Sequence, residues 1–412
     1  MKLSFLVQRY GAEFIGGAEK YVRSMATGLA AMGHDITVIT SCATSYADWA
    51  DVYPAGVAVE AGVTVHRVPV RSPRDNERFI PLHLRAVDSR EVPLWPWAQE
   101  RWAQTMGPDL GDVEPLLAAT ATASDVTIVV GYHYSQSLWL TGIAAAYGPT
   151  MVIPTAHPEG AFHVGRVRQM FDHADRVVCL AQEEADLIAA VHGRAERLIV
   201  VPCPVEDITE PEPSLISATL ASHGLVQDRY GIVVGRVDPA KGSDDAVRFA
   251  SQYRRAIDPT FQLVVVGPGG EGQAPVDGVV PTGFIDDEQK NALVAGAGVM
   301  IQPSYMESFS LALMEGWLLK RPALIQRRSR VLAGHATRSG GGITYANYLD
   351  FEAGLTALRT QPTMAQTLGA NGREYCLREF AWDRVSSDFL EAAASTADAG
   401  QRRLGSTRSM SL

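Results

Sequence analysis

The chain has 412 residues, of which 46% are hydrophobic and 20% are charged, and its formal net charge is −10. This length and composition suit a globular protein of two domains. The negative charge gives no global basic field for nucleic acid, and no apolar run approaches the roughly 20 residues that span a bilayer. The four cysteines are widely spaced and form no C-x-x-C pair, so we expect reduced thiols in a cytoplasmic protein.

The first half of the chain alternates short apolar runs with helical patterns. It begins with Lys2–Val7, which is predicted as a strand and not as a signal peptide. Residues 18–32 have helical periodicity and are followed by Gly33, a typical helix C-cap. Further strands are predicted at Asp35–Thr40, Val63–Val68, Val126–Val130, Met151–Thr155, Arg176–Leu180 and Leu198–Val201. This alternation predicts a doubly wound parallel sheet that ends near residue 205.

The second half repeats the same pattern after an acidic, proline-rich linker predicted at Glu206–Pro213. Its strands are predicted at Tyr230–Gly235, Phe261–Gly267, Val279–Pro281, Gly298–Gln302, Ala323–Gln326 and Ile343–Tyr345. A last helix is predicted at residues 381–397, and the small, polar tail at 398–412 is predicted to be disordered. The sequence therefore predicts two Rossmann-like domains, at 1–205 and 206–380, that face each other across a cleft.

The segment Arg71–Trp102 interrupts this alternation with six arginines and three tryptophans. A long segment of this kind in a compact domain is often functional. Two interpretations stay open: an acceptor-binding region, or a solvated loop whose aromatic side chains are tucked against the domain. Peripheral contact with a membrane-borne acceptor is a further hypothesis for the same segment.

The most informative stretch is QPSYMESFSLALMEGWLLKRP at Gln302–Pro322. A short apolar strand leads into a turn and then into a helix predicted over about 308–320. Glu307 precedes this helix, and Glu315 lies about two turns further on. The N–H groups of residues 308–310 would then be free at the positive end of the helix dipole. The stretch predicts an anion site with carboxylates beside it for hydroxyl groups, as a sugar diphosphate would require.

Three other loops follow predicted strands. Gly16 and Gly17 open the first helix, where free N–H groups can meet an oxyanion, although a tight turn would explain the same glycines. In G-R-V-D-P-A-K-G, Arg236 and Lys241 offer a guanidinium and an ammonium that together could neutralise a diphosphate. His157 lies at the carboxyl end of a strand, where open α/β sheets bind ligands, but a lone histidine is more often structural.

Two further turns that contain glycine follow predicted strands. Gly267–Gly272 fits G-x-G-x-x-G by letter, but no helix follows it, so a turn is predicted and not a dinucleotide site. Gly283 and Phe284 lie in a turn before a helix predicted at Asp286–Ala297. Neither H-E-x-x-H nor D-x-D occurs, so no metal site is predicted.

In their order along the chain, these motifs resemble the donor site of the retaining GT-B glycosyltransferases of family four. The resemblance rests on P-S-x-x-E-S-F-S-x-x-x-x-E-x, on G-R-x-x-x-x-K-G and on the glycine loop after the first strand, and it covers about Met1–Ala394. It implies a GT-B fold and transfer of a sugar from a UDP- or GDP-linked donor to an acceptor hydroxyl, with retention and without a metal. Cell-envelope polysaccharide, glycolipid or other glycoconjugate synthesis is the implied setting.

The resemblance also implies roles for individual residues. It implies that Glu307 binds hydroxyl groups of the donor sugar and that Glu315 binds those of the ribose. It also implies that the leaving phosphate itself takes the proton of the acceptor hydroxyl. The implied catalytic residues are His157, Arg236, Lys241 and Glu307. The implied donor-binding residues are Gly16, Gly17, Gly283, Phe284, Ser308, Phe309, Ser310, Leu311 and Glu315. The C-terminal helix would cross back onto the first domain.

Other functions stay open at this point. A GT-B phosphorylase would accept free phosphate, and a nucleotide-sugar epimerase would change the donor sugar without an acceptor. A non-catalytic protein would bind a nucleotide sugar without turnover. The expected partners are a nucleotide sugar and a carbohydrate, lipid-linked or small-molecule acceptor, and no nucleic acid. A lipid-linked acceptor would bring a cytoplasmic protein to the inner face of the membrane.

Overall fold

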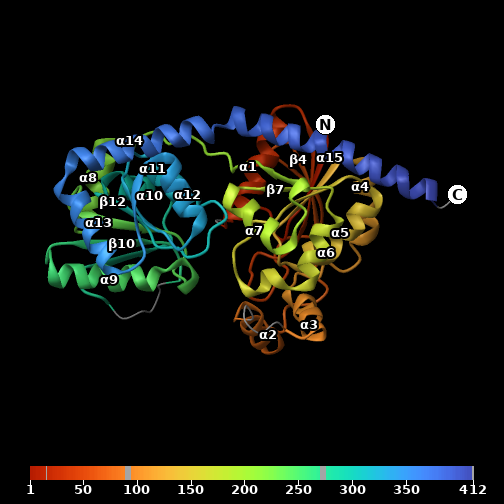
Figure 1. Ribbon diagram of the computed structural model, residues 1–412, viewed down its shortest axis with the longest axis horizontal. Coiled ribbons are helices and arrows are strands. Elements are labelled where there is room, and N and C mark those ends of the chain that lie inside the picture. The colour runs from red at the N-terminus through yellow and green to blue at the C-terminus, as the bar shows by residue number, and fades with distance from the viewer. Residues whose placement is uncertain (15, 89–93, 270–274, 411–412) are drawn as a thin grey trace. The chain divides into compact units, whose positions relative to one another are not determined.

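A computed structural model describes residues 1–14, 16–88, 94–269 and 275–410 of the chain. The chain divides into two compact units (Figure 1). Unit 1 contains Met1–Pro204 together with the segment that begins at Asp383, and unit 2 contains Val205–Trp382. Each unit has its own parallel sheet with helices between the strands, and each is described by itself below.

Unit 1 contains an eight-stranded sheet in the order β3-β4-β2-β1-β5-β6-β7-β8. Its strands are β1 (Lys2–Leu6), β2 (Asp35–Ser41), β3 (Gly56–Glu60), β4 (Val63–Val68), β5 (Val126–Val130), β6 (Thr150–Ile153), β7 (Arg176–Cys179) and β8 (Leu198–Val200). All neighbours are parallel except β3, which pairs with β4 in the antiparallel sense. Strand β3 was not predicted because it is an edge strand whose Val57 and Val59 are exposed to solvent.

The helices of unit 1 include two that the sequence did not predict. They are α1 (Gly17–Ala31), α2 (Asn76–Asp88), α3 (Pro96–Met106), α4 (Glu114–Ala123), α5 (Ser135–Tyr147), α6 (Gly165–His173), α7 (Gln182–His192) and α15 (Trp382–Met410). Helices α2 and α3 replace the irregular segment expected there and lie side by side at one end of the unit (Figure 1). Trp102 is fully buried, as expected for a tucked aromatic, but Trp95 and Trp97 are 70% and 68% exposed.

Unit 2 contains a fully parallel, six-stranded sheet in the order β11-β10-β9-β12-β13-β14. Its strands are β9 (Tyr230–Val234), β10 (Gln262–Val266), β11 (Val279–Gly283), β12 (Val299–Gln302), β13 (Ala323–Gln326) and β14 (Gly342–Tyr345). Its helices are α8 (Pro213–Ser222), α9 (Ser243–Ala256), α10 (Asp287–Gly296), α11 (Leu311–Leu318), α12 (Arg330–Ser339), α13 (Tyr348–Thr360) and α14 (Pro362–Glu379). The two doubly wound sheets agree with the predicted fold class.

The strand order places particular loops at ligand-binding positions. Strand β1 lies between β2 and β5, and β9 lies between β10 and β12, so the chain order reverses at both places. In open α/β sheets, ligands bind at the carboxyl ends of strands at such a switch point. Gly16 ends the loop after β1 and Gly17 is the first residue of α1, and the loop after β9 contains Arg236 and Lys241. The topology therefore puts the predicted motifs where each sheet can bind a ligand.

Helix α11 begins at Leu311 and not at Ser308 as predicted. Its N-cap Ser310 has φ 82°, a backbone angle that few residues other than glycine adopt and that cannot continue a right-handed helix. Ser308 and Phe309 therefore lie in the turn before the helix. The N–H groups at the start of the helix belong to Ser310 and the residues after it.

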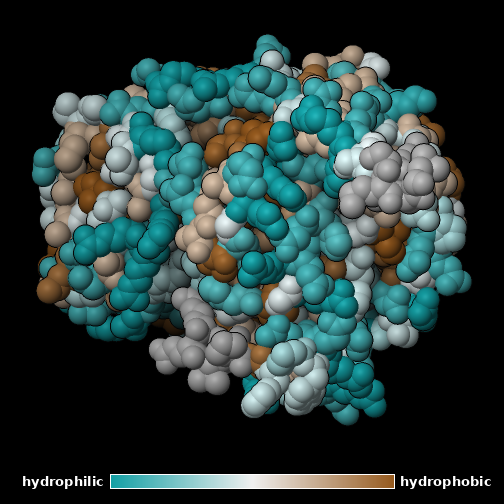
Figure 2. Space-filling view, turned by 45° about the vertical axis from the view of Figure 1, so that its right-hand side comes forward, coloured by the Kyte–Doolittle hydropathy of each residue, from teal (hydrophilic) through white to brown (hydrophobic). Residues whose placement is uncertain are grey.

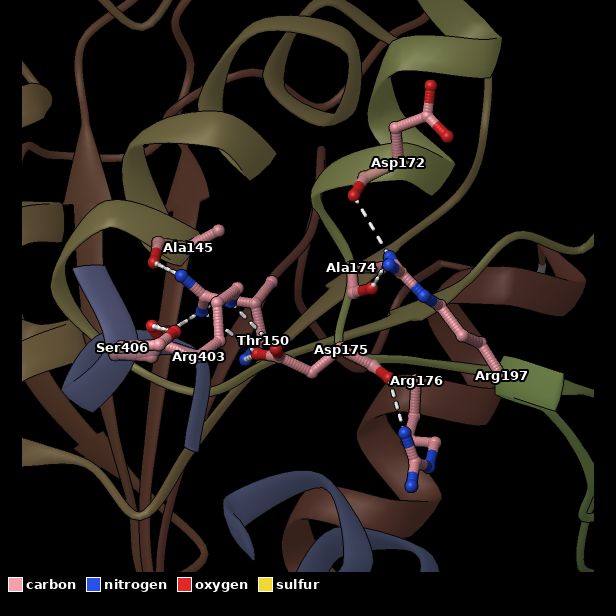
Figure 3. Close-up of polar contacts among 10 residues, drawn as sticks. Ala145, Thr150, Asp172, Ala174, Asp175, Arg176, Arg197, Arg403 and Ser406 are labelled. Carbon is pink, nitrogen blue, oxygen red and sulfur yellow. Dashed lines mark hydrogen bonds and ion pairs between the residues drawn. The ribbon is translucent and has the colours of Figure 1, made fainter. Parts of the chain in front are cut away.

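Residues 398–410 of the tail predicted to be disordered are helical, because α15 continues to Met410. Arg403 on this helix donates from Nε to Oδ1 of Asp175 at 2.8 Å and from a terminal nitrogen to the carbonyl of Ala145 at 2.6 Å (Figure 3). The buried Asp175 carboxylate also accepts the N–H of Thr150 at 2.9 Å. These contacts anchor the tail on unit 1.

Hydrophobic side chains are mostly buried in the cores of the two units. The face shown in Figure 2 is largely hydrophilic, and its hydrophobic residues form small, separate patches. Within the described ranges, no helix combines the length and apolarity that a membrane crossing requires. Residues 270–272 of the turn predicted at Gly267–Gly272 lie outside those ranges, as does Arg90 of the segment Arg71–Trp102.

Candidate functional site

Two loops of unit 2 bring Lys241 and Glu307 together. Lys241 follows β9, and Glu307 lies between β12 and α11. The Nζ of Lys241 donates to Oε1 of Glu307 at 2.8 Å. The Glu307 side chain is 11% exposed and that of Lys241 is 37% exposed, so the ammonium lies at the surface above a nearly buried carboxylate. The two side chains, which were both predicted to bind the nucleotide-sugar donor, are therefore in direct contact.

Gly242 allows these two loops to approach each other. Its φ of 68° favours glycine, and a Cβ at this position would lie 2.2 Å from the carbonyl oxygen of Pro303. Ser243 closes the same loop, because its hydroxyl accepts the N–H of Asp238 at 3.0 Å. The final glycine of G-R-x-x-x-x-K-G is thus required by a close backbone approach.

Gln302 orients the groups around Glu307. It ends β12, is 4% exposed, and donates from Nε2 to the hydroxyl of Ser310 at 2.7 Å and to Glu307 at 3.4 Å. Its Oε1 is buried and has no hydrogen-bond partner among the described residues. The sequence analysis gave Gln302 no role, although a polar residue at the end of an apolar strand was a signal that could have identified it.

Tyr305 attaches the loop after β12 to helix α9. Its hydroxyl donates to the carboxylate of Asp245, which also accepts from Arg248. Burial and the hydrogen bond to Asp245 raise the pKa of Tyr305 to about 12, so the phenol stays protonated and donates at neutral pH. For Asp245, burial alone would raise the pKa, but the hydrogen bonds from Tyr305 and Arg248 lower it.

Arg236 and Glu315 take part in other ion pairs. The Arg236 side chain is 57% exposed, and its Nε lies 3.4 Å from Oδ2 of Asp238 in the same loop. Glu315 on α11 accepts from Nζ of Lys290 at 2.9 Å, and Lys290 also donates to Asp287 at 2.7 Å. Lys290 was not identified from the sequence, because its partner Glu315 lies on a different helix.

Phe309 can offer a ligand only its backbone. Its side chain is 3% exposed and packs edge-to-face against His335 and Phe380, with ring centroids 5.4 and 5.0 Å away. Ser308 and Leu311 on either side are half-buried. The aromatic contacts therefore fix the turn in front of α11.

Gly283 is the last residue of β11, and Phe284 lies between β11 and α10. Gly283 has φ 65°, which explains the glycine, and the Phe284 side chain is 65% exposed. An exposed phenylalanine beside a strand end is available to stack on a planar ligand. Their predicted contact with the donor stays a prediction.

In unit 1, the glycine loop is shaped by a buried carboxylate. Glu19 is 1% exposed and accepts from Arg9 at 2.7 Å and from the hydroxyl of Tyr46. A Cβ on Gly16 would lie 2.2 Å from Oε2 of Glu19, whereas Gly17 has open space around it. Packing against Glu19 thus accounts for Gly16, and the sequence analysis did not identify this contact.

His157 follows strand β6 and lies beside Glu159. Its Nδ1 is 3.6 Å from Oε1 of Glu159, and the hydroxyl of Tyr132 donates to the same oxygen. The side chains of His157 and Glu159 are 26% and 17% exposed. The histidine is therefore partly exposed, and its Nδ1 lies beside the Glu159 carboxylate.

Glu184 supports the backbone next to His157. Its carboxylate is 1% exposed and accepts the N–H groups of Ala156 and Leu180, the latter at 2.6 Å. Burial raises the pKa of Glu184 to about 8, although both hydrogen bonds lower it. Glu184 thus ties the ends of β6 and β7 together from helix α7.

These residues offer the chemistry of anion and hydroxyl binding. Arg236 and Lys241 are cations at the carboxyl end of β9, and Glu307 is a hydrogen-bond acceptor beside them. Over the part of the chain that is described, no three histidine, cysteine or carboxylate side chains are arranged to hold a metal ion.

The sequence matches two families of known proteins. Residues 16–204 match the glycosyl transferase 4-like domain, and residues 228–344 match the glycosyl transferases group 1. The D-inositol 3-phosphate glycosyltransferase of Mycobacterium tuberculosis (strain ATCC 25618 / H37Rv) is 25% identical over 345 residues. That match covers 75% of this chain but 64% of the mycobacterial protein, which is just under two thirds of its length.

Solved structures resemble the chain over nearly all of its length. Anabaena HepE in complex with UDP and glucose has a TM-score of 0.70 at 14% identity, and the match covers 96% of this chain and 100% of that one. Trehalose-6-phosphate synthase OtsA has a TM-score of 0.71 at 13% identity, with 95% and 99% covered. At these low sequence identities, the similarity shows a shared fold and nothing further.

Proposed function

Because this chain belongs to the GT-B glycosyltransferases of family four, we propose that it transfers a hexose from a nucleotide sugar to an acceptor hydroxyl. The family and the GT-B fold predicted from the sequence are thereby confirmed. Retention at the anomeric carbon, independence of metal ions and a role in glycoconjugate synthesis belong to the proposal.

The observation that carries the proposal is the contact between Lys241 and Glu307 at a switch point of the unit 2 sheet. Lys241 and Arg236 would bind the donor diphosphate, and Glu307 would accept hydrogen bonds from sugar hydroxyls. Gln302 would keep Glu307 and Ser310 oriented. In a site of this kind, removal of one charge-stabilising donor typically lowers the rate by about 10²–10³-fold.

The proposed reaction needs no protein base and no metal. The bond between the anomeric carbon and the phosphate oxygen breaks, and its electron pair goes to the phosphate. Arg236 and Lys241 stabilise the developing negative charge. The acceptor oxygen bonds to the anomeric carbon on the same face, and its proton passes to the departing phosphate. His157 would line the sugar side of this centre.

The similar proteins indicate which donors and which acceptor to test first. HepE was solved with UDP and glucose, so UDP-sugars are the first donors to test and GDP-sugars the second. The mycobacterial relatives are named for D-inositol 3-phosphate, so that compound is the first acceptor to test.

The decisive experiment measures nucleoside diphosphate release from a panel of nucleotide sugars. We expect one donor to be consumed, with release lowered at least about 10²-fold in Arg236→Ala and in Glu307→Gln. Arg378→Ala is the matched control, since Arg378 is similarly exposed but lies on α14. EDTA should leave the rate unchanged. Release that survives in both site variants, or that requires an added divalent cation, would contradict the proposal.

We also propose that the protein is cytoplasmic and touches a membrane surface through α3 and Trp95, which directly precedes it. Trp95 and Trp97 are exposed, and tryptophan is favoured at the interface between lipid and water. Arg85 and Arg101 are exposed on α2 and α3 and would favour anionic lipid. Trp95→Ala/Trp97→Ala should reduce sedimentation with anionic vesicles at low salt. Equal sedimentation of variant and wild type would exclude this contact.

A further inference from the structure

A pocket of about 220 Å³ lies in unit 1 at the junction of α2 and α3. Three arginines line it, namely Arg74, Arg78 and Arg101. Trp49 and Gly107 are also in its wall, and a Cβ on Gly107 would lie 2.5 Å from the Trp49 ring. The pocket therefore has an aromatic wall, and its lining carries these three arginines together with the carboxylates of Asp75 and Asp109.

Arg74 is held in this wall without a carboxylate partner. Its guanidinium stacks over Phe79, 4.0 Å from the ring centroid, and lies 5.1 Å from that of Trp49. One terminal nitrogen donates to the carbonyl of Met106. Its Nε is buried and has no hydrogen-bond partner, and no ion pair reaches this side chain within the described part of unit 1.

Most of the other charged side chains around the pocket form ion pairs. Arg78 pairs with Asp75 at 3.2 Å, and Asp109 lies 3.9 Å from Arg71. Arg101 is exposed on the rim and forms no ion pair with any described residue. Two of the three arginines that line the pocket therefore form no ion pair with a described residue, although the Asp48 carboxylate is near enough to raise the pKa of Arg74.

Burial makes the unmatched charge of Arg74 costly. Burial lowers the pKa of Arg74 to about 10, so the side chain is still charged at neutral pH. A partly buried cation gains most from an anion that also satisfies its free N–H groups. Guanidinium forks fit phosphate and carboxylate oxygens in particular.

We propose that this pocket binds an oxyanion of the phosphate type that is carried by the acceptor. Its volume is below the roughly 300 Å³ of typical ligand pockets, so it suits an anionic group and not a whole nucleotide. Its assignment to the acceptor rests on the proposed function. The cations proposed for the donor diphosphate lie in unit 2, and this pocket lies in unit 1.

The pocket connects to the glycine loop through two aromatic rings. Trp49 packs edge-to-face on Tyr46, with ring centroids 5.5 Å apart. The Tyr46 hydroxyl donates to Glu19, which packs against Gly16. Two aromatic rings, those of Trp49 and Tyr46, thus lie between an anion on Arg74 and the ligand-binding end of the unit 1 sheet.

The test measures the Kd of inorganic phosphate by calorimetry on the full-length protein. We expect Arg74→Leu and Arg101→Ala each to weaken phosphate binding about tenfold, and less than about twofold weakening in Arg85→Ala and Arg378→Ala. Arg85 lies on α2 outside the pocket, and Arg378 lies on α14 in unit 2. If Arg236→Ala lost phosphate binding and Arg74→Leu kept it, the proposal would be overturned, since the anion would then occupy the donor site.

Two controls keep the result independent of folding and of the proposed function. Should Arg74→Leu fail to fold, Arg101→Ala and the position of tungstate in crystals of the wild type decide the question. Tungstate among Arg74, Arg78 and Arg101 supports the pocket, and tungstate elsewhere overturns it. Phosphate binding at the pocket in a protein that consumes no nucleotide sugar would refute the proposed function and leave the pocket in place.

A further arm distinguishes a soluble phosphate from a lipid headgroup. Wild type and Arg101→Ala are compared on phosphatidylcholine vesicles with and without phosphatidic acid, and with glucose 6-phosphate in solution. Weakened binding of the vesicles alone identifies a lipid headgroup as the source, and weakened binding of glucose 6-phosphate alone identifies a soluble phosphomonoester. Unchanged binding of both probes overturns the proposal.

Discussion

Gly242 sets the approach of the two loops that carry Lys241 and Glu307. In Gly242→Ala, the new methyl group would meet the Pro303 carbonyl and the backbone would be strained at positive φ. We expect a loss of about 2–4 kcal/mol in the free energy of unfolding, measured with urea, and loss of stabilisation by the donor.

The variant Gly224→Ala separates the cost of backbone strain at positive φ from the cost of the clash with the Pro303 carbonyl. Gly224 has φ 63°, and a methyl group added there would meet nothing within 4 Å, so only the backbone term of about 1–2 kcal/mol applies. Equal costs at the two glycines would show that the loops can move apart and that the close approach to Pro303 is not required.

Glu184 makes stability depend on pH in a definite direction. Its pKa is raised by burial to about 8 in the folded protein, whereas an unfolded glutamate titrates near about 4.3. Between these values the folded state holds a proton that the unfolded state has lost, so the contribution of Glu184 to stability falls as the pH rises. Above about pH 8 this contribution no longer changes.

The measurement is the free energy of unfolding between pH 5 and pH 8.5 (roughly the window set by the two pKa values) for wild type and Glu184→Gln. The variant cannot titrate, so its stability should fall less steeply with pH. Glu196→Gln, at an exposed position, should keep the wild-type slope. Identical slopes in all three proteins would show that Glu184 is ionised throughout this range in the fold.

At the level of elements, the strands that could be predicted were those with continuous apolar runs, because parallel strands in such sheets are buried on both faces. All six strands of unit 2 appear where the apolar runs indicated. Strand β3 lacked that signal because its valines face solvent. The start of α11 could not be predicted, since it depends on the φ angle of Ser310, which is held by Gln302.

Long-range partners explain what else was missed. Arg403 and Asp175 are 228 positions apart, so no local pattern could show that the tail is an anchored helix. Lys290 and Gln302 acquire their roles only when α10 and β12 come next to α11. By contrast, Lys241 and Glu307 could be named in advance because each lies in a distinctive motif next to a strand end, and the fold then puts them 2.8 Å apart.

At the level of the whole molecule, unit 1 is built from both ends of the chain. The chain enters unit 2 at Val205 and leaves it after Trp382, and within unit 2 the Val205 N–H donates to the Phe380 carbonyl at 2.9 Å. Helix α15 then completes the core of unit 1, where Phe389 is fully buried and stacks on Phe5 with centroids 6.3 Å apart. The stability of unit 1 therefore depends on residues that follow unit 2 in the sequence.

A chain that ends at Trp382 should lose unit 1 selectively. Each buried apolar side chain of α15, such as Val385 and Phe389, contributes about 1.5–3 kcal/mol, and a whole domain is stable by only about 5–15 kcal/mol. We expect hydrogen exchange to lose protection in β1 to β8 while β9 to β14 stay protected. A nucleotide sugar should still slow exchange around Lys241 and Glu307, because these residues and their partners all lie in unit 2.

Removal of residues 407–412 alone is the control, since it leaves Arg403 and its contacts with Asp175 in place. This shorter deletion should leave the exchange of both units unchanged. Protection lost equally from both sheets in the longer deletion would mean that α15 stabilises the molecule as one cooperative body. Protection kept in both would mean that unit 1 folds without its C-terminal helix, and the buried contacts of Phe389 would then contribute far less than their area implies.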